Sequence, residues 1–360
     1  MLSKRKTAMI FQSYTEAADT VARFIQSGDG DFNTLALTLF RLQAKHVPIL
    51  KSICTSRKIV PEQLKDWHQI PAIPTEAFQE YAVTSIPTSE RTAHFQSSGT
   101  ASQRPSRHWH HAASLHLYEI SLRAPFQRHV LENRSWTGLT LALLPRPEDA
   151  PHSSLVHMAQ ASLESDTVFA GQACHDGWQI DSAMCDKACQ ASIHQDKPLL
   201  IIGPAFAFLH WLDHSPHFYR LPTGSRLMET GGYKGRTREL PKADLHRLLS
   251  MRTSIPETRI ICEYGMCELS SQAYDRVAGA DHPRVFRFPH WARHAIINPE
   301  TGAPCAPNET GLLRVFDLSN TYSSIGIQTQ DLARPLEDGF ELQGRAQVAE
   351  PRGCSLNLLN

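Results

Sequence analysis

Three long apolar runs constrain the fold of this 360-residue chain most strongly. They are GLTLALLP at 138–145, KPLLIIGP at 197–204 and TRIICEYG at 258–265. Helix-like sequence lies between them, as in AFAFLHWLD directly after the second run. Continuous apolar runs that alternate with helices are typical of parallel strands covered by helices on both faces. We therefore expect an α/β fold with a mostly parallel sheet.

The sequence before and after this central part has a different texture. Apolar residues at helical spacing predict helices over 14–27 and 33–47, with Asn33 as the N-cap of the second. A third helix is expected over about 109–128, ending near Pro125. From residue 292, short strand-like segments separated by Gly, Pro, Asn and Asp predict a β-rich subdomain.

The length of the chain suits one large α/β unit or two unequal ones. We expect a single large domain over residues 1–340, in which residues 292–340 form the β-rich subdomain. Residues 341–360 are then a short C-terminal tail.

Composition argues against several classes of protein. Lys plus Arg equals Asp plus Glu, at 36 each, so no overall positive field favours nucleic acid. No apolar run reaches the ~18 residues that a membrane span requires, and AMIF near the N-terminus is too short for a signal peptide. We expect a cytoplasmic protein. The densest histidine group, HWHH at 108–111, lacks a cysteine or carboxylate at metal-ligand spacing.

A serine-rich stretch, SSGTASQRPSRH at 97–108, follows a short strand-like segment. Ser97, Ser98, Gly99 and Thr100 combine hydroxyl groups with a glycine that permits a tight turn. Such a loop, leading into a helix, is able to hold phosphate through hydroxyl and backbone N–H donors. It is not a Walker A loop. Taken alone, the stretch fits an ordinary polar turn better than a phosphate site.

Two later motifs also contain residues suited to nucleotide chemistry. CEYGMCEL at 262–269 follows the third apolar run, and the carboxyl ends of parallel strands border the ligand crevice of α/β sheets. There, Tyr264 is suited to stacking on a planar base and Glu268 to holding Mg²⁺. In QTQDLA at 328–333, Asp331 after a strand is able to accept hydrogen bonds from a ribose diol. Each motif alone is also compatible with a loop at a strand end.

The order of these motifs, followed by Gly-Arg, resembles that of the adenylate-forming enzymes. In finer detail the chain is similar to the LuxE-like acyl-protein synthetases, the fatty-acid-activating subunit family of the bacterial bioluminescence reductase complex. The matching text extends over roughly 70–356 and comprises FQSSGTASQRPSRH, IIGPAFAFLHWLD, METGGYKGRTREL, EYGMCELSSQAYD, TGLLRVFDLSN, TQDLA and DGFELQGRAQVAEPRGCSL.

The resemblance implies a ligase activity. ATP and a carboxylic acid, usually a fatty acid, would give an acyl-adenylate and pyrophosphate, with Mg²⁺ as the cofactor. The acyl group would then pass to a protein cysteine as a thioester. The family also implies an acyl-accepting protein partner such as an acyl reductase.

The resemblance assigns roles to single residues as well. On the nucleotide side, the phosphate loop is matched by Ser97, Ser98, Gly99 and Thr100, and a glycine-rich wall of the acyl and nucleotide pocket is matched by Gly231 and Gly232. The adenine-side motif is matched by Tyr264 and Gly265, and the ribose-binding aspartate is matched by Asp331. For the chemistry, Glu268 matches the Mg²⁺ ligand, Arg345 the hinge-side arginine that contacts ribose or phosphate, and Cys354 the acyl acceptor.

The sequence departs from the adenylate-forming pattern in three places. Ala101 and Ser102 stand where many phosphate loops have threonine and a second glycine, and Cys267 stands where the adenine-side motif has threonine. A thiol is a poorer hydrogen-bond donor than a hydroxyl. Because only residues 346–360 follow Arg345, we expect the separate C-terminal lid domain with its lysine to be absent or vestigial. The candidates for the missing positive charge are Lys234, Arg104 and Arg107.

Two alternatives stay open at this point. One is a ligase for an aromatic or secondary-metabolite acid that uses coenzyme A or another acceptor. The other is a degenerate nucleotide-binding subunit that acts as a scaffold in a reductase complex. The chain length of the acid and the oligomeric state are not specified by the sequence.

Overall fold

The computed structural model describes residues 10–97, 104–174, 177–232 and 240–346. The chain divides into two compact units. The first unit comprises Met1–Ser121, Cys267–Ser271 and Phe288–Asn360, and the second comprises Leu122–Met266 and Gln272–Arg287. Both units mix helices and strands, so the predicted α/β class is confirmed.

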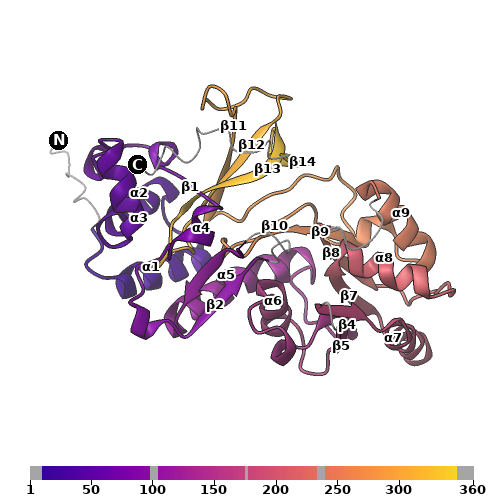
Figure 1. The fold of residues 1–360 in the computed structure, drawn as a ribbon. Coiled ribbons are helices and arrows are strands. Elements are labelled where there is room, and N and C mark those ends of the chain that lie inside the picture. The colour runs from indigo at the N-terminus through magenta and orange to yellow at the C-terminus, as the bar shows by residue number, and fades with distance from the viewer. Residues whose placement is uncertain (1–9, 98–103, 175–176, 233–239, 347–360) are drawn as a thin grey trace. The chain divides into compact units, whose positions relative to one another are not determined.

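The second unit is built on a seven-stranded sheet, with strand order β10-β9-β8-β7-β4-β5-β6 (Figure 1). Its strands are β4 (Leu139–Pro145), β5 (Val168–Cys174), β6 (Gly177–Ile180), β7 (Leu199–Pro204), β8 (Arg226–Thr230), β9 (Ile260–Tyr264) and β10 (Ala273–Tyr274). The five strands from β9 to β5 are parallel, and the edge strands β10 and β6 run antiparallel. The three apolar runs are β4, β7 and β9, so the predicted parallel sheet is confirmed.

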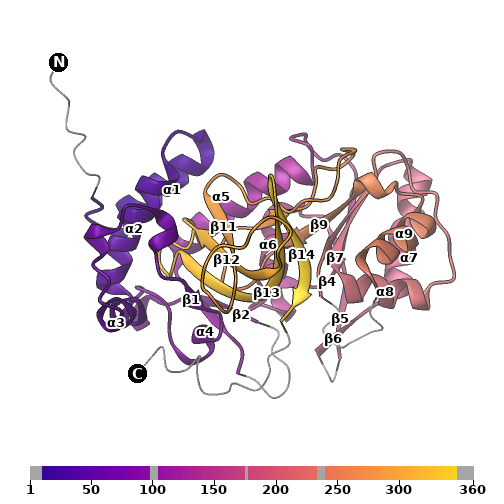
Figure 2. The same ribbon diagram turned by 90° about the horizontal axis from the view of Figure 1, so that it is seen from above.

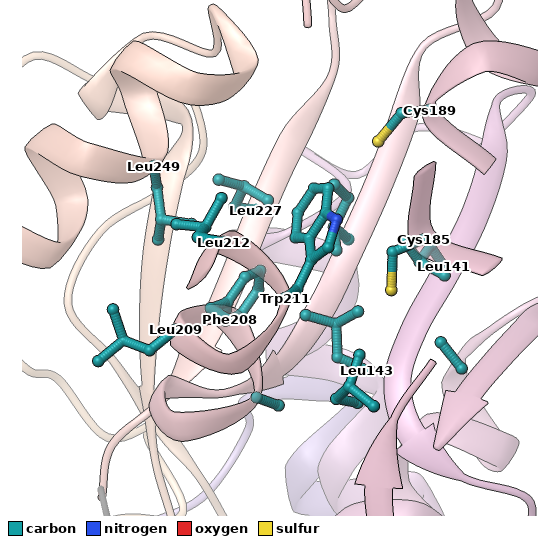
Figure 3. Packing of buried hydrophobic residues seen from close by; sticks show 14 of the residues in the cluster. Leu141, Leu143, Cys185, Cys189, Phe208, Leu209, Trp211, Leu212, Leu227 and Leu249 are labelled. Carbon is teal, nitrogen blue, oxygen red and sulfur yellow. The ribbon is translucent and has the colours of Figure 1, made fainter. Parts of the chain in front are cut away.

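Helices cover this sheet. They are α6 (Ser154–Ser162), α7 (Ser182–Gln195), α8 (Ala205–His214) and α9 (Lys242–Thr253), with short 3₁₀ turns η4 (Pro147–Asp149) and η5 (Glu257–Arg259). On one face, alternate residues of β4, β7 and β8 pack against α7, α8 and α9 around the fully buried Trp211 (Figure 3). The intervening residues, such as Ala142 and Ile202, are also buried. Burial on both faces explains why these strands are apolar throughout.

The N-terminal part of the first unit is helical (Figure 2). It comprises α1 (Tyr14–Ser27), α2 (Phe32–His46), α3 (Pro48–Ser56), α4 (Ala77–Glu80) and the 3₁₀ turns η1 (Pro61–Gln63), η2 (Trp67–Gln69) and η3 (Thr88–Glu90). The helix predicted over 14–27 is confirmed as α1, which ends at Gly28 in the left-handed conformation with φ 74°.

The second predicted helix is present as α2, but its N-cap is Asp31 and not Asn33. The Asp31 carboxylate accepts a hydrogen bond from the backbone N–H of Thr34 at 2.8 Å. Asn33 instead contacts a later segment, since its side chain donates to the Lys65 carbonyl at 2.9 Å and accepts from the Trp67 N–H at 2.7 Å. The Asn33 side chain therefore binds a segment distant in sequence and does not cap α2, although the local sequence predicted that it would.

The β-rich segment predicted from residue 292 forms most of a five-stranded sheet. Its strands are β1 (Ile73–Pro74), β11 (Ala292–Ile297), β12 (Gly311–Asp317), β13 (Gly326–Leu336) and β14 (Gly339–Arg345). The order is β1-β13-β12-β11, and β14 also pairs with β13. β11 to β14 form antiparallel pairs, whereas β1 runs parallel to β13. β14 reaches Arg345, beyond the predicted boundary of the subdomain at residue 340.

The sequence predicted that the serine-rich stretch leads directly into a helix, and this prediction is wrong. β2 (Ala93–Gln96) and β3 (Arg107–His110) form an antiparallel hairpin around it, and α5 (Ala112–His129) begins only afterwards. The helix predicted from about residue 109 begins later, because the buried His108 and His110 alternate with less buried neighbours, which is the period of a strand. Pro125 lies inside α5 and does not end it, because Leu122 and Phe126 are buried on either side.

Within the described residues, no helix combines the length and apolar character that crossing a membrane requires.

The core around Trp211 provides a test of the second unit. Its indole Nε1 donates to the Asp186 carboxylate at 2.9 Å, and its ring is fully buried. We expect Trp211→Ala to lower the free energy of unfolding by ~3–5 kcal/mol, because it leaves a cavity and removes this hydrogen bond. Met251→Ala, at a side chain that is 58% exposed, is the control and should cost at most ~0.5 kcal/mol. Urea titration of both variants measures the difference, and similar losses would contradict the packing.

Candidate functional site

The carboxyl ends of β8 and β9 place two of the predicted motifs side by side in the second unit. The strands are parallel neighbours, with Thr230 in register with Glu263. The chain leaves β8 into Gly231 and Gly232 and leaves β9 after Tyr264. Gly231 and Gly232 are exposed, and a side chain at Gly231 would meet open space. This is the sheet edge at which α/β folds bind ligands.

Tyr264 is less open than its predicted stacking role suggested. Its side chain is buried, and its ring packs edge-on against Phe286 with centroids 6.2 Å apart. Gly265, the next residue, leaves little space, since a Cβ atom there would lie 2.4 Å from Glu263 Oε1. The predicted adenine-side motif therefore combines a packed ring at Tyr264 with a backbone at Gly265 that lies close to the Glu263 carboxyl group.

Charged groups gather beneath this edge, on β8, β9 and α9. Glu229 is buried, with Oε1 at 3.1 Å from His246 Nε2 and 3.5 Å from Lys242 Nζ. Burial alone would raise the pKa of Glu229, but Lys242 and His246 outweigh it and hold the pKa at about 2. Lys242 Nζ also donates to Cys262 Sγ at 2.6 Å. Burial raises the pKa of the Cys262 thiol, so the sulfur stays neutral.

Glu263 is the opposite case. It is buried, and burial together with the negative charge of Glu229 raises the pKa of its carboxyl group to about 8. Two carboxyl groups on neighbouring strands therefore differ in protonation at neutral pH. Glu229 is ionised because it has cationic partners, and Glu263 keeps its proton.

In the first unit, a buried polar network holds the segment Cys267–Ser271. Asp317 is fully buried, and its carboxylate accepts from the Ser271 hydroxyl at 2.7 Å and from the Ser270 N–H at 2.9 Å. Asn320 accepts from the Ser270 hydroxyl at 2.8 Å and donates to the Glu268 carbonyl at 2.9 Å. Burial raises the pKa of Asp317 to about 6, although these donors oppose the shift. The network fixes the backbone that carries Glu268.

Glu268 itself is a buried carboxylate, 5% exposed, without a cationic partner among the described residues. Its Oε2 accepts a hydrogen bond from Cys267 Sγ at 3.2 Å. On the backbone side, the Cys267 carbonyl accepts from His108 Nδ1 at 3.0 Å. Burying an uncompensated carboxylate is costly unless a cation or strong donors meet it.

The serine-rich stretch is described only at its two ends. The Ser97 N–H donates to the Ser106 carbonyl at 3.2 Å, and the Ser97 hydroxyl accepts from the Ser106 N–H at 3.0 Å. Ser97 therefore closes the β2–β3 hairpin. The predicted phosphate-loop residues Ser98, Gly99 and Thr100, and the variant positions 101 and 102, lie outside the described residues.

Asp331 and Arg345 lie directly opposite each other on β13 and β14. The sequence placed Asp331 after a strand, but it lies inside β13, next to a change in register between Leu332 and Ala333. Such irregularities redirect side chains near functional sites. Arg345 is the exposed last residue of β14 and so belongs to the sheet. The structure thus brings together two residues that the sequence had assigned separately.

Other predicted residues are not placed at a site. Cys354 and Lys234 lie outside the described residues. Arg104 is exposed and lies 3.7 Å from Glu80, and Arg107 is exposed on β3. In the described part of the chain, no three His, Cys, Asp or Glu side chains form a group able to hold a metal, and this includes the HWHH histidines.

Sequence reasoning did not find the charged residues Glu229, Lys242 and Asp317. Their signal was present, because a charged residue within an apolar strand, as in RLMET and LLRVFD, needs a partner when buried. The partners come from other elements, however, and only the fold identifies them.

No protein-family model matches this chain, and none of the curated proteins matches it. Solved structures do match. An open conformation of 2-hydroxyisobutyryl-CoA ligase with 2-HIB-AMP and CoA has a TM-score of 0.61 at 12% identity, covering 96% of this chain and 74% of that chain. The thioesterification state of that ligase gives a TM-score of 0.62 at 11% identity, with coverages of 93% and 68%.

A third similar structure is ATP-bound MatB from Rhodopseudomonas palustris. It has a TM-score of 0.50 and 16% identity, covering 74% of this chain and 50% of that chain. At these identities the likeness concerns the fold. The chain shares the fold of these solved structures.

The raised pKa of Glu263 predicts a dependence of stability on pH. The folded pKa of about 8 lies above the usual 4.5, so the contribution of the bound proton is complete below about 4.5 and is lost as pH rises through about 8. Between pH 6 and pH 8 the free energy of unfolding of the wild type should fall by roughly 2 kcal/mol relative to that of Glu263→Gln, which mimics the protonated acid.

Urea unfolding at the two pH values measures this difference. The control is Glu300→Gln, at an exposed turn residue of the first unit, and its stability should follow that of the wild type at both pH values. A constant gap between the wild type and Glu263→Gln would show that Glu263 is ionised throughout.

Proposed function

We propose that this protein is an adenylate-forming ligase. It activates a carboxylic acid with ATP to an acyl-adenylate and passes the acyl group to a thiol. The observation that carries the proposal is the buried Glu268 carboxylate, which lacks a cationic partner among the described residues. Glu268 belongs to the motif CEYGMCEL and lies four residues after the end of β9 at Tyr264. The ligase fold and the glycines at the end of β8 support the same interpretation.

Glu268 fits a Mg²⁺ ligand by its chemistry. Mg²⁺ binds carboxylate and phosphate oxygens, and the Glu268 carboxylate accepts only a weak thiol hydrogen bond from the described residues. When bound with ATP, Mg²⁺ would neutralise charge on the phosphates. The network around Asp317 holds Glu268 in place through the backbone, so the carboxylate is positioned before a ligand arrives.

The other residues have proposed roles in holding the nucleotide. Ser97 begins the phosphate loop, Tyr264 and Gly265 lie on the adenine side, and Asp331 accepts hydrogen bonds from the ribose. Arg345, opposite Asp331 on β14, contacts ribose or phosphate. Gly231 and Gly232 form a wall of the acyl and nucleotide site at the end of β8, where a side chain at Gly231 would meet open space.

In the reaction that we propose, a carboxylate oxygen of the acid attacks the α-phosphorus of ATP. The P–O bond to the β-phosphate breaks, and pyrophosphate leaves with that electron pair. A thiolate then attacks the acyl carbonyl and AMP leaves, which forms the thioester. Donors that converge on the phosphates stabilise the charge that develops in the first step.

For the acid and the acceptor, the LuxE-like motifs favour a fatty acid and a protein cysteine, with Cys354 as acceptor. The alternative acceptor is coenzyme A, and it is supported by the similar fold of 2-hydroxyisobutyryl-CoA ligase, whose structures contain CoA. An acyl reductase partner and a cytoplasmic location stay predictions. The scaffold alternative is favoured by the substitutions at Ala101, Ser102 and Cys267.

Acid-dependent exchange of pyrophosphate into ATP tests the first step. We expect exchange with at least one member of a panel of fatty, aromatic and short hydroxy acids. Glu268→Gln should lower the exchange rate by about 100-fold or more, because it removes the charge that meets Mg²⁺. Its free energy of unfolding should be maintained or raised, because an uncompensated buried charge is removed.

Glu300→Gln again serves as the control, since it makes the same carboxyl-to-amide change at an exposed turn, and it should leave exchange unchanged. ATP binding without exchange for any acid would favour the scaffold alternative and contradict the ligase.

Mass spectrometry tests the acceptor. After incubation with ATP and the best acid, we expect one acyl group that neutral hydroxylamine removes, and we expect Cys354→Ser to abolish it. Cys174→Ser, at an exposed thiol, is the matched control and should retain the label. Full labelling of Cys354→Ser would show that another thiol is the acceptor, and formation of acyl-CoA without protein labelling would support the coenzyme A alternative.

A further inference from the structure

The first unit contains a cavity that none of the nucleotide or acyl candidates lines. Its volume is about 270 Å³. It is lined by Arg314 of β12, Gln328 of β13 and Pro74 of β1, by Arg57 directly after α3, and by His68 and Gln69 of η2. The volume is below the ~300 Å³ of the smallest drug-sized pockets, so it suits a small ligand or one end of a larger ligand.

Two arginines determine the charge of this cavity. The Arg314 guanidinium uses Nε to donate to Gln328 Oε1 at 2.9 Å, and its Nη atoms have no hydrogen-bond partner in the described part of the chain. The Arg57 side chain has none in the described ranges either. No carboxylate among the described residues lies within ion-pair distance of either guanidinium, and the lining contains no acidic residue.

Arg314 is half-buried, and Arg57 is exposed at the side of the cavity. Burial and the nearby positive charge of Arg57 both lower the pKa of Arg314. Two like charges therefore line one cavity, whereas the buried Arg226 has a carboxylate partner, Glu132, at 2.9 Å.

The remaining polar groups do not neutralise these charges. His68 Nδ1 lies 2.6 Å from the Asp66 carboxylate, so this nearby acidic group already has a partner. The amide of Gln328 is held by the carbonyl groups of Leu313 and Thr329, both at 3.2 Å from Nε2. Gln328 therefore presents a fixed oxygen to Arg314 and orients the guanidinium.

We infer that this cavity is a binding site for a phosphate-type dianion, held between the guanidinium groups of Arg57 and Arg314. Two guanidinium charges match the two negative charges of a dianion better than they match the single charge of a carboxylate ligand. The planar fork of arginine also suits tetrahedral oxyanions. The ligand is free phosphate, pyrophosphate or the phosphate end of a larger molecule. The site is independent of the proposed ligase activity, because none of the residues assigned to that activity lines the cavity.

Protection of arginine from phenylglyoxal tests the site residue by residue. The intact protein is modified with and without phosphate, pyrophosphate, AMP or sulfate at constant ionic strength, and adducts are mapped by mass spectrometry. We expect phosphate or a phosphate ester to slow modification of Arg57 and Arg314 by roughly tenfold. Arg23, which is on α1 in the same unit, should react at an unchanged rate.

Calorimetric titration with the protecting anion then tests the two charges. Arg57→Gln and Arg314→Gln should each weaken binding by about tenfold or more, as expected for a lost charge-assisted hydrogen bond. Arg314→Lys, which keeps the charge and loses the fork, should retain part of the affinity. Arg23→Gln loses the same charge elsewhere and should bind like the wild type.

The outcomes are distinguishable. Protection by AMP or pyrophosphate but not by phosphate would identify a larger phosphate-bearing ligand at the same site. Equal protection by sulfate, or no protection of Arg57 and Arg314 by any anion, would overturn the inference. So would unchanged affinity in the double variant Arg57→Gln with Arg314→Gln. Thermal unfolding without ligand checks that each variant is folded.

Discussion

The carboxylate of Asp317 organises the part of the first unit on which the proposed chemistry depends. It lies at the end of β12, fully buried, and accepts hydrogen bonds from the side chain of Ser271 and from the backbone of Ser270 and Ser319. These hydrogen bonds hold the segment Cys267–Ser271 in one conformation, and removal of the carboxylate would leave each donor without its partner. Glu268 lies on that segment and takes its position from it.

The second unit has a comparable arrangement at the ends of β8 and β9. Glu229, Lys242 and His246 form a compact group in which the carboxylate is ionised, whereas the neighbouring Glu263 keeps its proton. The physical cause is the same in both units. Burial makes an isolated charge expensive, so each buried carboxylate either has cations and donors around it or becomes neutral. Glu268 is buried with only the Cys267 thiol as a side-chain donor and without a cationic partner among the described residues, which is why a cation is proposed there.

The elements that sequence predicted well are those whose signal is local. β4, β7 and β9 were visible as continuous apolar runs, and α1 as a helical stripe that ends in glycine. The errors arose where a distant residue competes for the same group. Asn33 contacts Lys65 and Trp67 in place of capping α2, and β3 forms because it pairs with β2. Pro125 is tolerated in α5 because the residues on either side are packed in the core.

The sequence by itself determined the parallel α/β sheet, the β-rich C-terminal segment and the order of the motifs, because apolar periodicity and turn residues act over short distances along the chain. Only the tertiary structure decided which groups share an environment. It placed Arg345 opposite Asp331, surrounded Glu229 with Lys242 and His246, left Glu268 without a cationic partner among the described residues, and brought Arg57 of α3 to the same cavity as Arg314 of β12. Burial and charge pairing depend on residues far apart in sequence, so they are properties of the folded chain.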